Sequence, residues 1–110
     1  MIYPNGDFYK GNLKNDKKDG FGILTYKNGN VYEGQFEENS KNGHGKLTYT
    51  NFMEYTGQWV SDLKHGKGKT VYTNGNIHTY IGSYHRSMKS GFGKEYFTNG
   101  FMYEGEYKNG

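Results

Sequence analysis

The sequence predicts an all-β fold, an elongated single-layer antiparallel sheet of successive β-hairpins. Three observations predict it: a Tyr-x-Gly triplet that recurs every 23 to 25 residues, a Gly-x-Gly marker that follows the triplets in register, and an Asn-Gly pair ahead of most of them. The chain has 110 residues and 18 glycines, and these markers contain every glycine except Gly110. A fixed period of this length is the signature of a repeat protein.

The triplets divide the chain into one repeat array. Four full units cover residues 9–31, 32–54, 55–79 and 80–102, with partial units at 1–8 and 103–110. The third unit is longer because it carries two extra residues within 76–79. Since both chain ends fall inside a repeat, we expect either a longer array or edges that a partner covers.

Each unit is predicted to form one hairpin. In the first, strands Phe21–Tyr26 and Val31–Phe36 flank Asn28-Gly29, a pair typical of a two-residue type I′ turn with positive φ at both positions. Polar links such as 37–42 then carry the chain to the next hairpin. Phe52 stands where the other turns have glycine, which predicts a different turn there.

Strand alternation places aromatic residues on one face of this sheet. Glycines on the same face leave slots that a backbone, an overlying ring or a ligand can approach. A lone hairpin is unstable in water, so neighbouring units must bury this aromatic row against each other. The ring positions after the first unit include Tyr49, Trp59, Tyr72, Tyr80, Tyr84 and Phe97.

The sequence argues against catalysis and against a cofactor or metal. Gly66–Thr70 is similar to the end of a phosphate-binding loop, but Leu63 stands where that motif needs glycine and a strand follows it. The four histidines have no metal-site spacing, and we expect them on the surface. The acidic residues are scattered, and a single-layer sheet offers no deep catalytic cleft.

Charge leaves two classes of partner open. The formal net charge is +3, and Lys46, Lys69 and Lys94 occupy one repeat position, which predicts a row that could attract an anionic membrane surface. Nucleic-acid binding is disfavoured because the aromatic residues keep fixed stacking positions in the repeat. No cysteine occurs, and the first residues do not resemble a signal peptide, which favours a cytoplasmic protein.

The three markers together resemble the MORN (membrane occupation and recognition nexus) repeat family across essentially the whole chain. The resemblance implies a scaffold or protein-binding module attached to cytoskeletal or membrane-associated structures. It also implies phospholipid binding as an alternative. Family membership alone does not select between these roles.

We therefore predict a non-catalytic protein-interaction scaffold. Its aromatic groove would hold a partner peptide or helix through Tyr49, Trp59, Tyr72, Tyr80, Tyr84 and Phe97. The opposing expectation is that the chain's own links and neighbouring repeats cover these rings. On the other face the later units gather apolar residues, which predicts a partner-binding or self-association surface formed by Val71, Ile81, Tyr96 and Met102.

Overall fold

The computed structural model describes residues 1–73 and 78–108, and in these residues it contains one antiparallel sheet. The strands follow one another in the sheet in chain order. No described helix is long and apolar enough to cross a membrane. The strands within the described residues are β1 (Phe8–Lys14), β2 (Lys17–Thr25), β3 (Val31–Glu37), β4 (Ser40–Thr48), β5 (Met53–Val60), β6 (Leu63–Tyr72), β7 (His78–His85), β8 (Met88–Phe97) and β9 (Met102–Tyr107).

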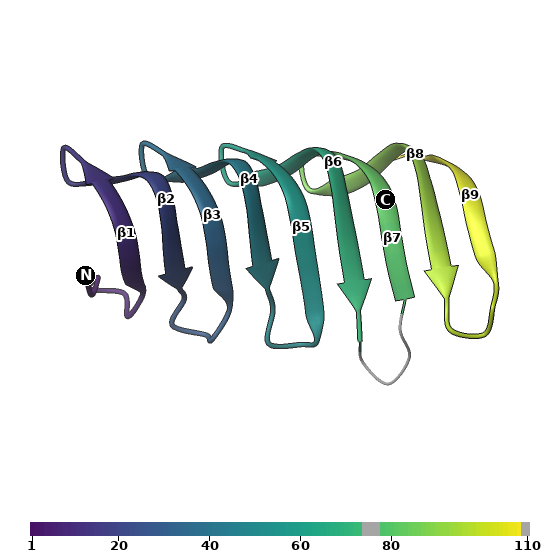
Figure 1. Ribbon diagram of the computed structural model, residues 1–110, viewed down its shortest axis with the longest axis horizontal. Coiled ribbons are helices and arrows are strands. Elements are labelled where there is room, and N and C mark those ends of the chain that lie inside the picture. Colours follow the sequence, from purple (N-terminus) through teal and green to yellow (C-terminus); the bar gives the residue numbers. More distant parts are fainter. Residues whose placement is uncertain (74–77, 109–110) are drawn as a thin grey trace.

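The strands stand side by side along the long axis, as predicted (Figure 1). The principal extents are 47 × 27 × 18 Å and the Cα radius of gyration is 15.2 Å. A compact domain of this length would have a radius of gyration of about 13 Å. The single-layer, elongated all-β prediction is therefore confirmed.

The positions of the turns differ from the prediction. The two-residue turns with positive φ lie in the polar links, as at Glu38 and Asn39 (φ 46° and 73°) between β3 and β4. The residues of the polar links therefore form the ends of the strands and the turns between them. For example, β2 begins at Lys17 and not at the predicted Phe21. The link hairpins and the Asn-Gly loops lie at opposite ends of the strands (Figure 1).

The Asn-Gly pairs at 5–6, 28–29 and 99–100 form three-residue loops instead of type I′ turns. The amide of Tyr26 donates to the carbonyl of Asn30 at 2.8 Å, and only Gly29 of the pair has positive φ. The Asn28 side chain accepts a hydrogen bond from the Asn30 amide at 2.9 Å, which explains the asparagine. Positions 74–77 lie outside the described residues. They contain the Asn-Gly pair of the third unit and half of its predicted insertion.

The loop at Phe52 corrects a second expectation. Its closing bond, from the Tyr49 amide to the Met53 carbonyl at 2.8 Å, matches that of the glycine-containing loops. Phe52 itself takes the left-handed conformation, with a φ of 67°. The loop closure is therefore kept, and the phenylalanine backbone adopts the conformation that glycine adopts elsewhere.

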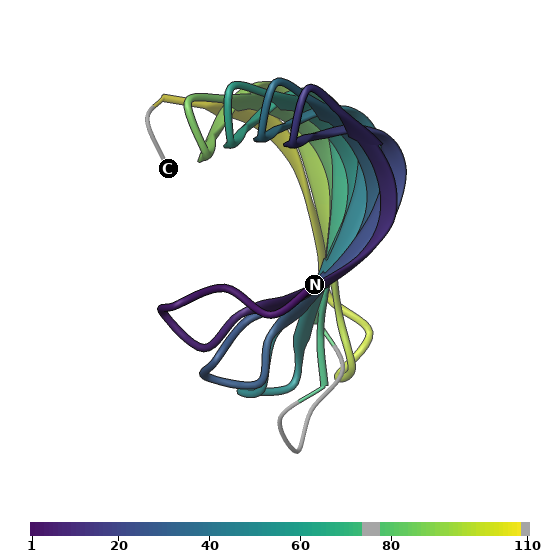
Figure 2. The same cartoon turned by 90° about the vertical axis from the view of Figure 1, so that its left-hand side faces the viewer.

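A repeated irregularity curls the sheet. Between the pairs Gly34–Gly45 and Phe36–Lys41, one residue of β3 faces three of β4, and Gly43 has a φ of 98°. The same shift recurs in each of the other three link hairpins. An excess of residues on one strand bends it, so the sheet becomes a trough that is C-shaped in cross-section (Figure 2).

Candidate protein-interaction surfaces

The floor of the trough is a row of buried tyrosines, one per unit. Each curves over two glycines, and its hydroxyl donates to the carbonyl three residues ahead, as Tyr32 does to Gln35 at 2.8 Å. A Cβ placed on Gly45 would lie 2.1 Å from the Tyr32 hydroxyl oxygen. The slots predicted from the glycines are thus filled by the chain's own rings. The other buried members of the row are Tyr9, Tyr55 and Tyr80.

A second set of rings packs edge-on between these tyrosines. The Trp59 ring lies 5.6 Å from that of Tyr32 and 5.1 Å from that of Tyr55, nearly perpendicular to both. Tyr84 continues the column between Tyr55 and Tyr80 at 5.1 and 5.3 Å. Among the rings predicted to contact a partner, Trp59, Tyr80 and Tyr84 belong to this column and are at most 5% exposed. In this structure they form the core.

The other predicted groove rings are less buried than the rings of this column. Tyr49 and Tyr72 are half-buried, and Phe97 is exposed. Burial raises the pKa of Tyr49 to about 12, because the phenolate is poorly solvated there and the neighbouring Tyr26 and Tyr72 add to the effect. These rings, unlike Trp59, retain surface for a ligand.

Sequence reasoning missed a row of lysines on the concave face. Lys18, Lys41, Lys64 and Lys89 occupy one repeat position, 23, 23 and 25 residues apart, and each ammonium lies over aromatic rings. The Lys64 Nζ is 5.0 Å from the Tyr55 ring centroid, a cation–π distance. Their common spacing was visible in the sequence, but the curl that turns them inward was not.

The next repeat fixes the backbone of each of the first three lysines. The amide of Lys18 donates to Asn39 Oδ1 at 2.9 Å, and the amide of Asn39 donates to the Lys18 carbonyl at 2.8 Å. Asp62 makes the same pair of bonds to Lys41. Ser87 does so to Lys64, through its Oγ. Because each turn is anchored in this way, the lysines are held in line along the trough.

The C-terminal part of the convex face carries apolar side chains, which we call the convex patch. Tyr96 pairs with Thr79 on β7 and with Met102 on β9, and Ile81 lies in the adjoining row opposite Lys94. Ile81, Tyr96 and Met102 are 45%, 41% and 53% exposed. Phe92, which sequence reasoning missed, is 58% exposed and lines a shallow hollow with Ile81 and Tyr96. The convex patch comprises Val71, Ile81, Phe92, Tyr96 and Met102.

The lysines predicted to attract a membrane lie on this convex face, and two of the three are paired. Lys46 Nζ is 3.4 Å from a carboxylate oxygen of Glu54, and Lys94 Nζ is 3.4 Å from one of Glu104. Within the described residues, Lys69 has no ion-pair partner. The row is therefore partly neutralised.

A cluster of polar side chains surrounds the buried carboxylate of Glu95. His78 Nε2 and the Tyr107 hydroxyl are hydrogen-bonded to it, and Lys89 Nζ lies 3.4 Å away. Burial alone would raise the pKa of Glu95, but these three neighbours together hold it below its usual value. His78, expected on the surface, is half-buried here and its ring stacks between Tyr72 and Phe97.

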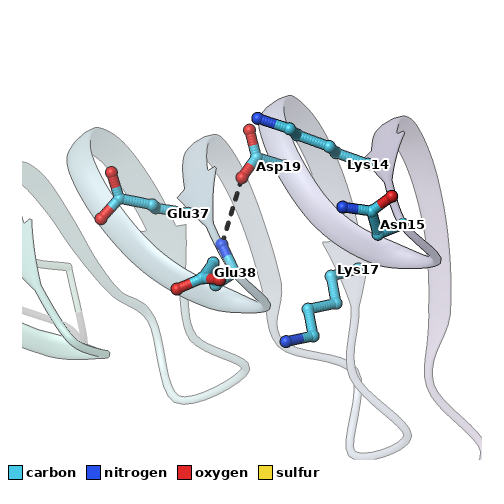
Figure 3. Close-up of a pocket in the computed structure, with 6 residues that line it drawn as sticks. All are labelled: Lys14, Asn15, Lys17, Asp19, Glu37 and Glu38. Carbon is cyan, nitrogen blue, oxygen red and sulfur yellow. Dashed lines mark hydrogen bonds between the residues drawn. The ribbon is translucent and has the colours of Figure 1, made fainter.

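A polar hollow between the first two link hairpins offers no ligand set. Asp19 accepts a hydrogen bond from the Glu38 amide at 3.3 Å, and side chains of both charge signs face the hollow (Figure 3). Among the described residues no group of histidine and acidic side chains could hold a metal ion. Gly66–Thr70 lies inside β6 and is not a phosphate-binding loop.

The fold and its two faces define an open, single-layer array of β-hairpin repeats. The MORN repeat model matches residues 9–31, 32–53, 55–77, 80–102 and 103–110, so the chain belongs to the MORN repeat family. No curated protein matches the chain significantly. MORN arrays are generally non-catalytic binding modules.

Proposed function

We propose that this chain is a non-catalytic protein-interaction scaffold that binds a partner peptide or helix, or a second copy of itself, through the convex patch. The carrying observation is that Ile81, Tyr96 and Met102 are exposed side by side on neighbouring strands. A contiguous exposed apolar surface of this kind usually marks an interaction site. Its role would be that of a cytoplasmic scaffold at cytoskeletal or membrane-associated structures.

The composition of the convex patch supports a protein ligand. Tyr96 and Phe92 offer large, rigid rings, which contribute contact area at little cost in conformational entropy. Lys67, Lys94 and Glu104 line the same hollow and form a polar rim around the apolar centre. The equivalent face of the earlier units is mostly polar, so the patch is confined to β6–β9.

The test replaces the centre of the convex patch by Ile81→Lys together with Tyr96→Lys. Sedimentation velocity over a concentration series measures self-association of the unaltered chain, and peptides selected from a display library supply ligands if that chain is monomeric. We expect the double variant to weaken either association at least about tenfold, because it places two charges in the apolar contact. Its melting temperature should stay unchanged.

Phe21→Lys is the matched control. Phe21 occupies the repeat position of Phe92 and is similarly exposed, at 52%, but it lies in the first unit, away from the patch. It should leave association unaltered. Unfolding of the double variant, or association equal to that of the unaltered chain, would show that the patch is core or ordinary surface.

The phospholipid alternative is tested with anionic vesicles over a salt series, since salt screens exposed charges. Replacing Lys46, Lys69 and Lys94 with glutamate should abolish any vesicle binding. Partner binding should stay largely intact, because Lys94 belongs to the polar rim of the convex patch and not to its apolar centre. Loss of partner binding at moderate salt, with the fold preserved, would favour the phospholipid alternative instead.

A further inference from the structure

We propose that the concave trough binds an acidic peptide segment, whose carboxylates meet the unpaired ammonium groups of Lys18 and Lys64. These two belong to the lysine row formed by Lys18, Lys41, Lys64 and Lys89. This surface lies on the face opposite the convex patch, so the inference stands independently of the proposed function. Its basis is a cation that recurs once per unit, over aromatic rings, on the concave side of the sheet.

Two members of the lysine row, Lys18 and Lys64, have no ion-pair partner among the described residues. The side chains of the other two are only 12% and 19% exposed. Lys41 pairs with Asp62 at 3.5 Å and Lys89 with Glu95 at 3.4 Å. Within the described residues no carboxylate lies at ion-pair distance from Lys18 or Lys64. Both lysines are half-buried with their ammonium groups over aromatic rings, and this burial lowers the pKa of each. A bound anion would supply the missing counter-charge.

The spacing of the row specifies the ligand. Successive lysines are two strands apart, which is about 9.5 Å at the usual distance between strands. An α-helix returns to the same face after seven residues, about 10.5 Å, and a polyproline II helix after three, about 9.3 Å. A peptide with one carboxylate per such interval can therefore reach Lys18 and, two intervals further on, Lys64.

The shape of the trough favours a peptide over a membrane or a nucleic acid. The sheet curves into a trough (Figure 2), and the lysine ammonium groups lie over its floor rings. A flat bilayer cannot follow this concave surface. The half-buried Tyr49 and Tyr72 add aromatic surface and hydroxyl groups that a peptide backbone can contact. Lysine ammonium groups already lie over the Tyr55 and Tyr80 rings, so these rings are not free to stack on the bases of a nucleic acid.

The test measures binding of a designed helical peptide with glutamates at every seventh position by fluorescence anisotropy. The variant combines Lys18→Gln with Lys64→Gln, and the control combines Lys46→Gln with Lys69→Gln, which removes the same charge from the convex face. We expect the trough variant to weaken binding about tenfold or more and the control to change it less than about twofold. A composition-matched peptide with all glutamates at one end should bind weakly.

A second variant separates charge from packing. Lys18→Arg with Lys64→Arg keeps the cation over the rings and should bind within about threefold of the unaltered chain. Three results would overturn the proposal. They are binding by the Gln variant as tight as by the unaltered chain, equally tight binding of the two peptides, and loss of binding in the folded Arg variant. Tighter, trough-dependent binding of oligouridylate or of anionic vesicles would also overturn it. Ile81→Ser with Tyr96→Ser should leave peptide binding unaltered, so failure of this proposal is distinguishable from failure of the proposed function.

Discussion

At the scale of single residues, the tyrosine of each Tyr-x-Gly triplet explains half of the 18 glycines. In the second unit, the Tyr32 ring occupies the space above Gly34 and Gly45, so a Cβ at either glycine would collide with its hydroxyl. The hydroxyl is then satisfied by the Gln35 carbonyl at 2.8 Å. The tyrosine therefore buries its ring and pairs its hydroxyl within a single layer of sheet.

Phe52 is the residue where backbone strain can be tested. Its φ of 67° costs a non-glycine residue about 1–2 kcal/mol, and its side chain is 65% exposed and contributes little packing. Phe52→Gly should therefore raise the free energy of unfolding by about 1 kcal/mol, measured by urea denaturation.

Phe101→Gly is the control for this prediction. Phe101 is similarly exposed, at 72%, but it does not have positive φ. The glycine there should lower the free energy of unfolding by about 0.5–1 kcal/mol through the entropy of the unfolded chain. A destabilised Phe52→Gly variant would show that the ring contributes more than the strain costs.

The link hairpins are the elements that turn a flat sheet into a trough. Their extra residues bend β2, β4, β6 and β8, and three of their turns hydrogen-bond to the preceding hairpin. Asp62 is the clearest case, because its Oδ1 accepts from the Lys41 amide at 2.8 Å and lies 3.5 Å from Lys41 Nζ.

Substitutions at Asp62 should separate the hydrogen bond from the charge. Asp62→Ala removes the acceptor and places alanine at a φ of 69°, so it should cost about 1–2 kcal/mol of unfolding free energy. Asp62→Asn keeps an acceptor oxygen and tolerates this backbone, so it should cost less than about 0.5 kcal/mol. Urea denaturation of both variants checks this. Equal losses would mean that the ion pair, not the turn contact, holds the hairpin.

Glu95 gives the last full hairpin a polar anchor where earlier units have Leu24, Leu47 and Thr70. Its lowered pKa means that the folded state binds the proton less well than the unfolded state does. The contribution of the Glu95 carboxylate to stability is therefore complete above the ordinary carboxyl range. It is lost as the pH falls through the lowered pKa.

Glu95→Gln should reveal this dependence. The substitution removes the charge near Lys89 and the pairing with His78, so the variant should be less stable than the unaltered chain at neutral pH. The difference should shrink on acidification, because the unaltered chain loses its carboxylate. Urea denaturation between about pH 7 and about pH 3 measures it. A constant difference over that range would show that Glu95 acts through packing alone.

At the scale of the whole molecule, the repeat period was enough to predict the sheet and its aromatic face. Tyr80 is buried like its counterparts despite the insertion before it, because two extra residues leave the alternation of the strand unchanged. The curl was not predictable, because it comes from the register shifts in the link hairpins, which were interpreted as plain connections. The lysine row and the partners of Glu95 depend on that curl, so their roles were also missed. Alternation alone was enough to predict that Val71, Ile81, Tyr96 and Met102 share one face of the sheet, and the strand pairing agrees with this. Their role in binding stays a prediction.

The core rings become more exposed toward β9. Tyr55 has strands on both sides and is fully buried, with Trp59 and Tyr84 packed edge-on against it. Tyr103 occupies the same repeat position but is 48% exposed, since β9 pairs only with β8 among the described strands. In a one-dimensional array each unit is stabilised by its neighbours, so stability should fall from the centre to this edge.

Equivalent truncations should therefore have unequal costs. Tyr55→Ala leaves a cavity between two rings and should lower the free energy of unfolding by about 3–5 kcal/mol. Tyr103→Ala removes a half-exposed ring in contact with Tyr107 alone among the aromatic residues described, and should cost about 1 kcal/mol or less. Urea denaturation followed by circular dichroism gives both values, and amide exchange should be slowest in β5 and fastest in β9. Similar losses of unfolding free energy at the two positions would show that the array is as stable at β9 as at its centre. That result would contradict a stability that is the sum of contacts between neighbouring units.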